Sequence, residues 1–330
     1  MHIQALIFHP YRIPLATGQI RSGIFLHVTD EKGNSGWGDV APLPQWSRET
    51  LEEALLQLKQ KRQEIIQIDW TADACLDTLA ELNLLPSVSF GLESALLSLL
   101  KPLSAHSIAT SALLMGSLQE ILQQAKLRAR EGYTSAKLKV SHFTFAEAAN
   151  VICQLKDQFR LRIDVNRAWR TTDSMEFFSQ FPSDAFDYVE EPCQNPHDLA
   201  LFPHPLAVDE SFPQDLSLSE LESLPTLKAL IYKPTIRGGM VHCLPLHKWA
   251  VERGITLVLS SSFESDLGLA HIASMAQRLS LSAPVGIGTY HLLQDFVCAP
   301  PLQFFGSTVH IPALLAPKHT STFGRCHKFL

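Results

Sequence analysis

The sequence lacks the features that would assign it to a membrane, secreted or nucleic-acid-binding class. No stretch approaches 18 consecutive apolar residues, and the first residues, MHIQALIFHPYRIPL, lack the basic start and apolar core of a signal peptide. Charge of one sign is not in excess, because 27 Lys and Arg stand against 33 Asp and Glu, a net charge of −6. This balance gives no basic surface for nucleic acid. We therefore expect a cytoplasmic protein with neither a nucleic-acid nor a membrane partner.

Cysteine is scarce, and its spacing excludes the common cysteine-based sites. The six cysteines are scattered along the chain without a CxxC pair, which argues against a structural zinc site and favours reduced thiols. With 46% apolar and 18% charged residues, the chain has enough apolar content for a large folded core. Its length of 330 residues predicts one large domain and a smaller one.

The N-terminal part of the chain predicts an α+β unit. Three strand-like segments are joined by turn-forming residues into an antiparallel meander, and helical spacing of apolar residues follows them. The strand segments are 2–13, 23–30 and 36–41, and the helical ones are 47–67 and 71–84. Strands and helices grouped in separate blocks are typical of an α+β domain.

Two local details of this unit are also predicted. Ser47 stands before the first helical segment as its N-cap. Residues 15–22 are polar and contain Gly18, so we expect a mobile loop, and Arg21 within it is a candidate for closing over a substrate. The simpler alternative for Arg21 is a solvent-exposed loop arginine.

The rest of the chain alternates short apolar segments with helical spacing. Eight segments have the length and composition of buried strands, and helices are expected between them. The segments are 111–116, 134–140, 160–166, 187–192, 206–211, 227–234, 255–262 and 285–289. Strands that alternate with helices form parallel sheets through crossover connections, and eight of them predict a barrel.

Charged residues close five of these segments, where a buried strand should carry none. They are Lys139, Asp164, Glu190, Asp209 and Lys233, roughly 19–26 residues apart. A buried charge is costly unless it is paired or bound to a metal, so five at successive strand ends are not a packing accident. The carboxyl ends of barrel strands meet at one mouth, where catalytic groups collect. Three carboxylates flanked by two lysines predict a divalent-metal site with a base on either side.

Six motifs in this part of the chain resemble those of the enolase superfamily. They are KLK (137–139), IDVNRAW (163–169), VEEP (189–192), DES (209–211), YKPT (232–235) and SSSFES (260–265). Residues 36–50, GWGDVAPLPQWSRET, are similar to the capping-domain signature of o-succinylbenzoate synthases, in the muconate-lactonizing-enzyme-like subgroup. The resemblance implies a modified TIM barrel, (β/α)7β, closed by an α+β capping domain. We expect the capping domain over 1–97, the barrel over 98–300 and a C-terminal segment over 301–330 that packs back on the capping domain.

Carried over residue by residue, the resemblance assigns the metal ligands to Asp164, Glu190 and Asp209. Three carboxylates suit Mg²⁺, which prefers hard oxygen ligands and leaves positions open for substrate oxygens, and Mn²⁺ is expected to substitute for it. The alternative is a set of salt-bridged barrel carboxylates without a metal. Glu191 and Glu210 follow two of the ligands, and we expect them to support the ligands from the other side of their strands.

The resemblance implies that Lys139 is the general base and that Lys233, across the barrel, is the second catalytic lysine. Lys137 faces the same way as Lys139, because side chains alternate along a strand, and it adds a like charge there. The alternative for Lys233 is a structural ion pair with a ligand carboxylate. The seventh strand segment ends in SSSFES without a histidine, which favours a two-lysine site over one with a histidine base.

Further residues are expected to line or support the site. Arg162 and Asn166 share the strand face of Asp164, with Arg162 deeper in the barrel and Asn166 at its mouth. A purely structural buried pair explains Arg162 nearly as well. By the resemblance, the positions that line the substrate cavity are Ser262, Glu264 and Gly288.

The reaction that the resemblance implies is the syn dehydration of 2-succinyl-6-hydroxy-2,4-cyclohexadiene-1-carboxylate to 2-succinylbenzoate, a menaquinone precursor. The chain departs from the family pattern in IDVN, where IDAN is frequent, and in GIGT at 286–289, where an acidic residue is common, so substrate preference stays open. One alternative is an N-acylamino acid racemase or dipeptide epimerase, which would use both lysines in turn. The other is a non-catalytic metabolite-binding barrel, against which the five charged strand ends argue. The sequence leaves the oligomeric state open.

Overall fold

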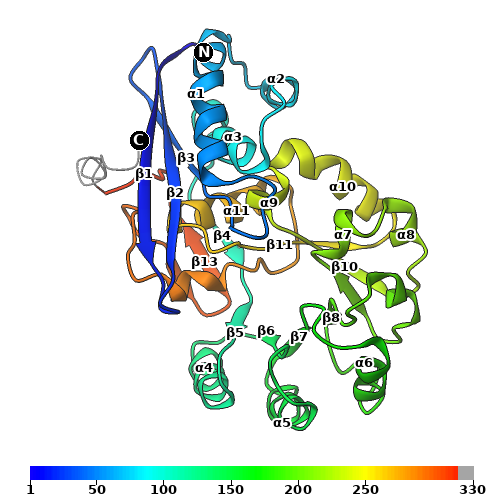
Figure 1. The fold of residues 1–330 in the computed structure, drawn as a ribbon. Coiled ribbons are helices and arrows are strands. Elements are labelled where there is room, and N and C mark those ends of the chain that lie inside the picture. The colour runs from blue at the N-terminus through cyan, green and yellow to red at the C-terminus, as the bar shows by residue number, and fades with distance from the viewer. Residues whose placement is uncertain (319–330) are drawn as a thin grey trace.

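The computed structural model describes residues 1–318, and the N-terminal part of the chain forms an antiparallel sheet with helices packed beside it (Figure 1). Strands β1 (Ile3–Pro14), β2 (Ile20–Asp30) and β3 (Ser35–Val40) pair in the order β1-β2-β3. The helices are α1 (Leu51–Gln67), α2 (Cys75–Glu81) and α3 (Pro86–Leu100). The predicted α+β unit, hereafter the cap, is confirmed.

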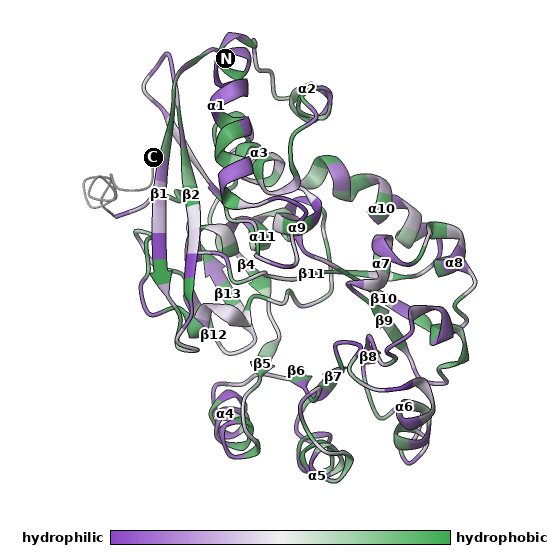
Figure 2. Ribbon diagram, in the orientation of Figure 1, coloured by the Kyte–Doolittle hydropathy of each residue, from purple (hydrophilic) through white to green (hydrophobic). Residues whose placement is uncertain are grey.

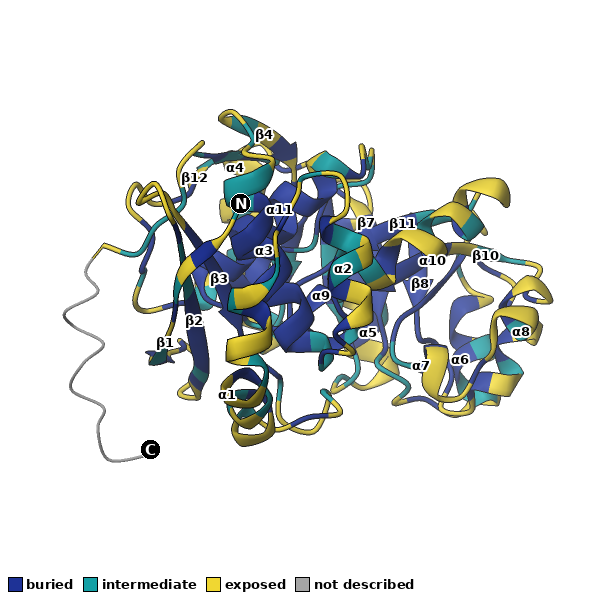
Figure 3. Cartoon of the chain, turned by 90° about the horizontal axis from the view of Figure 1, so that it is seen from above, coloured by how far each residue is buried: buried dark blue, intermediate teal, exposed yellow. Residues whose placement is uncertain are grey.

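Helix α3 packs against β3 at a distance that only glycine permits. A Cβ on Gly38 would lie 1.9 Å from the carbonyl oxygen of Gly91, and a Cβ on Gly36 would lie 2.1 Å from that of Ala95. Every residue of α3 over 87–97 is buried (Figure 3). The sheet and the helix therefore pack backbone to backbone.

The predicted loop at 15–22 is shorter in the structure: residues 15–19 form a turn, and 20–22 belong to a strand. Strand β1 continues to Pro14 and β2 begins at Ile20, and the two pair up to the end of the hairpin. Polar composition suggested a loop, but here it reflects a short turn in which Gly18 has a φ of +82°. The turn also contacts the barrel, because Ala16 donates its N–H to the carbonyl of Leu292 and Gln294 donates its N–H to that of Pro14.

Helix α1 begins after Thr50, so the predicted cap at Ser47 is also wrong. The Thr50 hydroxyl accepts the N–H of Glu53, and the Glu53 carboxylate accepts the N–H of Thr50, which makes a capping box. The Ser47 hydroxyl instead accepts the N–H of Leu43 in the preceding turn.

The larger part of the chain forms one parallel sheet of seven strands in the order β11-β10-β9-β8-β7-β6-β5, curled into a barrel. The strands are β5 (Ala112–Leu114), β6 (Ser135–Lys139), β7 (Arg160–Asp164), β8 (Tyr188–Glu190), β9 (Leu206–Val208), β10 (Leu227–Tyr232) and β11 (Thr256–Leu259). The main helices are α4 (Leu118–Arg130), α5 (Phe145–Leu155), α6 (Thr171–Phe178), α10 (Met240–Glu252) and α11 (Asp266–Arg278). Shorter turns are η1 (Pro196–Leu201), α7 (Ser211–Gln214), α8 (Leu218–Glu222), α9 (Pro234–Arg237) and η2 (Gly288–Leu292).

The predicted eighth strand at 285–289 is reduced to two isolated bridges. Val285 bridges to Thr110, ahead of β5, and Gly286 bridges to Ser260, just after β11. These two residues therefore connect the two edges of the seven-stranded sheet. The segment cannot continue as a strand because η2 starts at Gly288. The modified barrel is confirmed, with its last strand shortened to a bridge.

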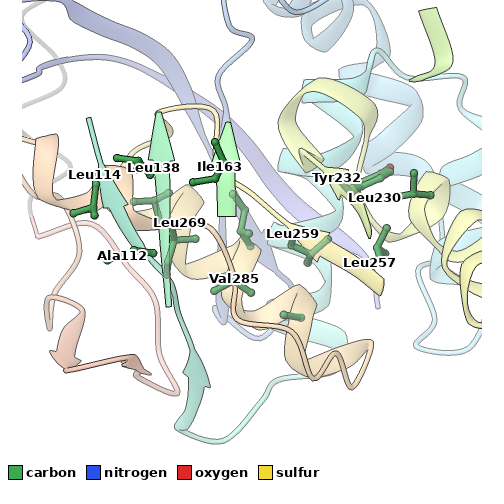
Figure 4. Close-up of a cluster of buried hydrophobic side chains, with 14 of the residues drawn as sticks. Ala112, Leu114, Leu138, Ile163, Leu230, Tyr232, Leu257, Leu259, Leu269 and Val285 are labelled. Atoms are coloured by element: carbon green, nitrogen blue, oxygen red, sulfur yellow. The ribbon is translucent and has the colours of Figure 1, made fainter. Parts of the chain in front are cut away.

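Side chains alternate between the barrel interior and the surrounding helices. Leu138, Ile163 and Leu259 belong to a large buried cluster that also contains Leu269 of α11 (Figure 4). Helices α4 and α5 carry both hydrophilic and hydrophobic residues (Figure 2), as expected when one face packs on the barrel. The neighbours of Leu138 on β6 are two lysines, which the alternation directs into the barrel.

The C-terminal segment forms a small sheet with a strand that precedes the barrel. Strands β12 (Gln303–Phe305) and β13 (Thr308–Ile311) pair with β4 (His106–Ala109) in the order β12-β13-β4. The domain limits stay predictions: the one after residue 97 falls inside α3, and part of 301–330 lies outside the described residues. Among residues 1–318, no helix has the length and apolarity needed to cross a bilayer.

We predict that Thr50→Ala lowers the free energy of unfolding by about 1 kcal/mol, because it removes the capping box of α1. Ser47→Ala is the matched control and should cost less than half as much, since Ser47 makes one hydrogen bond in a turn before the helix and none to α1. Urea denaturation followed by far-ultraviolet circular dichroism measures both. A larger loss for Ser47→Ala would place the cap where the sequence first suggested.

Candidate active site

Three buried carboxylates stand side by side at the carboxyl ends of neighbouring strands. Asp164 ends β7 and Glu190 ends β8, and the two are paired in register. Asp209 follows β9 by one residue. Their exposed fractions are 0%, 0% and 2%. The predicted ligand residues therefore lie together, as the strand-end pattern implied.

Three lysines supply positive charge among these carboxylates. The Lys137 ammonium lies 2.9 Å from Asp164 Oδ2 and 2.7 Å from Glu190 Oε1, so it sits between the two. Lys139 Nζ is 3.3 Å from Asp164 Oδ2 and donates to Asn166 Oδ1 at 3.0 Å.

On the other side of the carboxylates, Lys233 forms a close ion pair with Asp209. It also lies over the ring of Trp46, with Nζ 5.2 Å from the ring centroid. Trp46 belongs to the cap, and nothing in the sequence pattern identified it.

Burial and repulsion between the carboxylates raise their pKa values, whereas the neighbouring lysines lower them. Burial, reinforced by the charge of Asp164, raises the pKa of Glu190 to about 8. Burial also opposes ionisation of Asp164, but Lys137 and Lys139 outweigh it and hold the pKa of Asp164 well below its usual value. Despite burial, the neighbouring carboxylates raise the pKa of Lys137 well above its ordinary value. Positive charge between the carboxylates is thus a condition for their ionisation.

Asp209 is held by contacts to its backbone. The Glu191 carboxylate accepts the N–H of Asp209 at 2.8 Å and the N–H of Ser211 at 2.9 Å. The buried guanidinium of Arg237 donates to the Asp209 carbonyl. The sequence predicted the supporting place of Glu191 but not that of Arg237, which lies beyond the strand pattern on which the prediction was based.

The three carboxylates supply oxygen atoms, which are the ligands that a hard divalent cation prefers. Glu190 Oε2 is buried and accepts no hydrogen bond, and buried Asp164 Oδ2 meets only the Lys137 and Lys139 ammonium groups, although both oxygens are strong acceptors. As the side chains stand, no three His, Cys, Asp or Glu residues within 1–318 converge closely enough to share one ion. The Lys137 and Lys233 ammonium groups are paired with the same carboxylates and fix their present positions.

A cavity of about 160 Å³ opens beside this cluster. Lys137, Lys139 and Lys233 line one part of it, and the cap contributes Leu43 and Trp46. Serines following β11 also line it, and Gly288 approaches so closely that an added Cβ would lie 2.7 Å from Leu113 Cβ. The cavity thus combines cationic groups, hydroxyls and apolar surface.

The remaining predicted residues divide into those that line the cavity and those that do not. Arg162, Asn166, Ser262 and Gly288 are among its lining residues. Glu264 is fully buried behind the wall and accepts the N–H of Ser262 at 2.6 Å. Arg21 lies within β2 and is only 4% exposed, so neither a loop position nor solvent exposure describes it.

Two family models together match most of the chain. The model described as "Enolase C-terminal domain-like" matches residues 120–317, and the one described as "MenC, N-terminal domain" matches residues 7–99. The o-succinylbenzoate synthase of Pasteurella multocida is 30% identical over 295 residues, which are 85% of each chain. That of Edwardsiella ictaluri is 31% identical over 307 residues, covering 88% of this chain and 91% of the relative.

Solved structures of enolase-superfamily enzymes have the same fold. The L-Ala-D/L-Glu epimerase from Bacillus subtilis aligns with a TM-score of 0.82 and 18% identity, covering 96% of this chain and 98% of that one. The muconate lactonizing enzyme from Pseudomonas putida aligns with a TM-score of 0.78 and 19% identity, covering 96% of each chain. At this identity the two structures bear on the fold alone, and they confirm a barrel with a cap.

Arg162 also takes part in an ion pair at the bottom of the barrel, which predicts a pH-dependent stability. Its Nε donates to Asp187 Oδ2 at 3.0 Å, and the exposed Arg160 binds the other oxygen. Burial raises the pKa of Asp187, but Arg162 and Lys228 outweigh it and hold that pKa below its usual value. The stabilisation is therefore complete above the usual aspartate pKa and is lost as pH falls through the lowered one.

We predict that Arg162→Met lowers the free energy of unfolding at pH 7 by about 2 kcal/mol, because it removes the buried partner of the half-buried Asp187 carboxylate. Arg160→Met, at a 73% exposed side chain, should cost about 0.5 kcal/mol or less. Urea denaturation from pH 7 to pH 3 should show the gap between wild type and Arg162→Met narrowing below about pH 4. Equal losses for the two variants, or a gap independent of pH, would contradict the ion-pair assignment.

Proposed function

We propose that this chain, which belongs to the o-succinylbenzoate synthase family of the enolase superfamily, dehydrates 2-succinyl-6-hydroxy-2,4-cyclohexadiene-1-carboxylate to 2-succinylbenzoate. It is a carbon–oxygen lyase of menaquinone biosynthesis. The observation that carries the proposal is the arrangement of two lysines on opposite sides of three buried carboxylates, all at one cavity.

The chemistry requires a base that takes a weakly acidic proton and an electrostatic setting that tolerates the resulting negative charge. We assign the base to Lys139, which lies on β6 at the cavity and is hydrogen-bonded to the neutral amide of Asn166. The lone pair of Lys139 Nζ takes the proton α to the substrate carboxylate. The same ammonium then returns a proton to the departing hydroxyl on the same face, so that water leaves as the ring becomes aromatic.

Lys233 is assigned a different role because its surroundings hold its charge. Its ammonium is paired with Asp209 and lies over the Trp46 ring, and only 15% of the side chain is exposed against 29% for Lys139. We propose that Lys233 stays cationic and steadies the negative charge on the intermediate. Lys137, Arg162, Asn166 and the hydroxyl of Ser262 complete the lining, with Glu264 and Arg21 as supports behind it.

Enolase-superfamily enzymes use a divalent metal, and we propose Mg²⁺ here, with Mn²⁺ able to replace it. Asp164, Glu190 and Asp209 would hold the ion, since they are buried carboxylates at adjacent strand ends and Glu190 Oε2 has no hydrogen-bond partner. A bound divalent ion would supply electrostatic stabilisation for charge developing on the substrate carboxylate. We further propose a small-molecule substrate as the only required partner and a cytoplasmic location.

A second candidate is an N-acylamino acid racemase or dipeptide epimerase, which the presence of a lysine on each side of the cavity favours. Such an enzyme needs both lysines to exchange protons with the substrate. Incubation of N-succinylamino acids or dipeptides in deuterated water, with deuterium incorporation read by mass spectrometry, separates it from a dehydratase. A non-catalytic binding barrel would show neither reaction.

The primary test follows the loss of cyclohexadiene absorbance with and without EDTA. We predict that EDTA abolishes turnover and that added Mg²⁺ restores it. Asp164→Asn, Glu190→Gln and Asp209→Asn should each lose more than about 100-fold in rate while remaining folded. Asp157→Asn, at an exposed carboxylate, is the matched control and should be unchanged.

Metal binding is also read without catalysis, as the rise in Tm of the wild-type chain on addition of Mg²⁺ or Mn²⁺. That rise should be missing in the three variants and present in Asp157→Asn. Full turnover after exhaustive chelation would end the metal assignment, as would wild-type turnover in the three variants.

The two lysines should respond differently to substitution. Lys139→Ala should lose at least about 10²–10⁴-fold in single-turnover rate, and Lys139→Arg should not recover it because guanidinium stays protonated. Lys233→Arg should retain part of the activity that Lys233→Ala loses. Lys156→Ala, at an exposed ion pair, serves as the control. A Lys139→Ala rate within about tenfold of wild type would make Lys233 the candidate base.

A further inference from the structure

The cap holds the cavity wall that follows β11. We call residues 260–265 the wall segment. Four of its residues line the cavity, and the Ser262 hydroxyl is buried without a hydrogen-bond partner. The segment ends at Ser265, the N-cap of α11, whose hydroxyl accepts the N–H of Gly268. Its shape therefore decides which polar groups this part of the cavity wall presents to a substrate.

A buried cap carboxylate fixes the end of this segment. Asp39, on β3 and 0% exposed, accepts both the N–H of Ser265 at 3.1 Å and its hydroxyl at 2.7 Å through Oδ2. Its other oxygen accepts the Tyr11 hydroxyl at 2.8 Å. Gly268 leaves room for this contact, because a Cβ there would lie 2.6 Å from Asp39 Oδ2. Asp39 thus spans the boundary between cap and barrel with both oxygens used.

A second contact from the cap holds the middle of the segment. Arg21 donates through Nε to the carbonyl of Phe263 at 3.1 Å, and its other nitrogens donate to the carbonyls of Ala41 and Pro42. Phe263 has a φ of +61°, a left-handed conformation that costs a bulky residue free energy and persists only where its surroundings enforce it. Two cap residues therefore act on a segment whose backbone would not adopt this shape unaided.

We propose that Asp39 is a positioning residue for substrate binding, which sets the shape of the wall segment through Ser265 while Arg21 holds Phe263. The proposal rests on the proposed function, because it assigns the wall segment to the same substrate. Asp39 touches neither the lysines nor the ligand carboxylates, so its loss should weaken binding and leave the proton-transfer step nearly intact.

The cap offers a matched control in a second buried carboxylate. Glu93 on α3 is 2% exposed and accepts the N–H groups of Met240 and Val241 at 2.6 and 3.1 Å, at the start of α10. It therefore joins the cap to a barrel helix through the same kind of contact. None of these three residues lines the cavity. A general loss of cap docking should raise KM in both Asp39→Ala and Glu93→Ala. A change confined to the wall segment should raise KM in Asp39→Ala alone.

The experiment compares Asp39→Ala with Glu93→Ala in the full chain, loaded with Mg²⁺, at a temperature where both are folded. We expect Asp39→Ala to raise KM about tenfold or more while kcat stays within about threefold of wild type. Glu93→Ala should lower Tm about as much as Asp39→Ala does and leave KM unchanged. Asp39→Asn keeps one acceptor oxygen, so its KM should fall between those of wild type and Asp39→Ala, and it replaces Asp39→Ala should that variant not fold.

Amide hydrogen exchange gives a reading that does not need turnover. Asp39→Ala should speed exchange across 260–268 and Glu93→Ala across 240–246, each without the other. An unchanged KM in Asp39→Ala and Asp39→Asn would overturn the proposal, as would equal KM increases in the Glu93 variant. A wild-type chain that binds but does not convert the cyclohexadiene would overturn the proposed function instead, and the exchange pattern would still decide whether Asp39 holds the wall segment.

Discussion

Three carboxylates shielded from water cannot all ionise side by side unless positive charge stands among them. The end of the barrel meets this constraint with Lys137 between Asp164 and Glu190 and with Lys233 on Asp209. The remaining lysine, Lys139, has its closest hydrogen bond to a neutral amide. The division of labour proposed for the lysines follows from this electrostatic requirement: Lys137 and Lys233 make the close ion pairs, and Lys139, 3.3 Å from Asp164 Oδ2, is the least closely paired of the three.

The same requirement couples metal binding to the charge of the site. Burial and the charge of Asp164 raise the pKa of Glu190 to about 8, so the ionised form of Glu190 depends on the positive charge beside it. Binding of a divalent ion would favour the ionised form of Glu190, since ligand carboxylates must be ionised. The backbone of Asp209 is held separately, by Glu191 and Arg237, while its side chain pairs with Lys233.

Much of this site could be predicted from the sequence because it follows the strand period. A charged residue at the end of each strand marks a position at the barrel mouth, and the structure brings Asp164, Glu190 and Asp209 together there. The pattern could not show that Lys137 sits between two of them, because that depends on the curvature of the sheet.

Contacts between distant parts of the chain were also beyond the sequence. Trp46 over Lys233 and Asp39 on Ser265 arise only when the cap docks on the barrel. The misplaced cap of α1 is different, since Thr50 and Glu53 carry the spacing of a capping box and could have been identified. The prediction of a full eighth strand was wrong because a segment with only two bridging residues has the same composition as a short strand.

The turn between β1 and β2 has a consequence for the order of folding. Its contacts join Ala16 to Leu292 and Pro14 to Gln294, and Arg21 and Asp39 reach residues more than 220 positions away. During synthesis from the N-terminus, these partners emerge late. The hairpin can therefore dock only after most of the barrel has been made. Contacts of such long sequence separation form slowly, because the chain loses the entropy of closing a long loop before the contacts stabilise it. The cap is thus synthesised first, but its contacts with the barrel form late in folding. The cavity wall that depends on those contacts is completed at the same late stage.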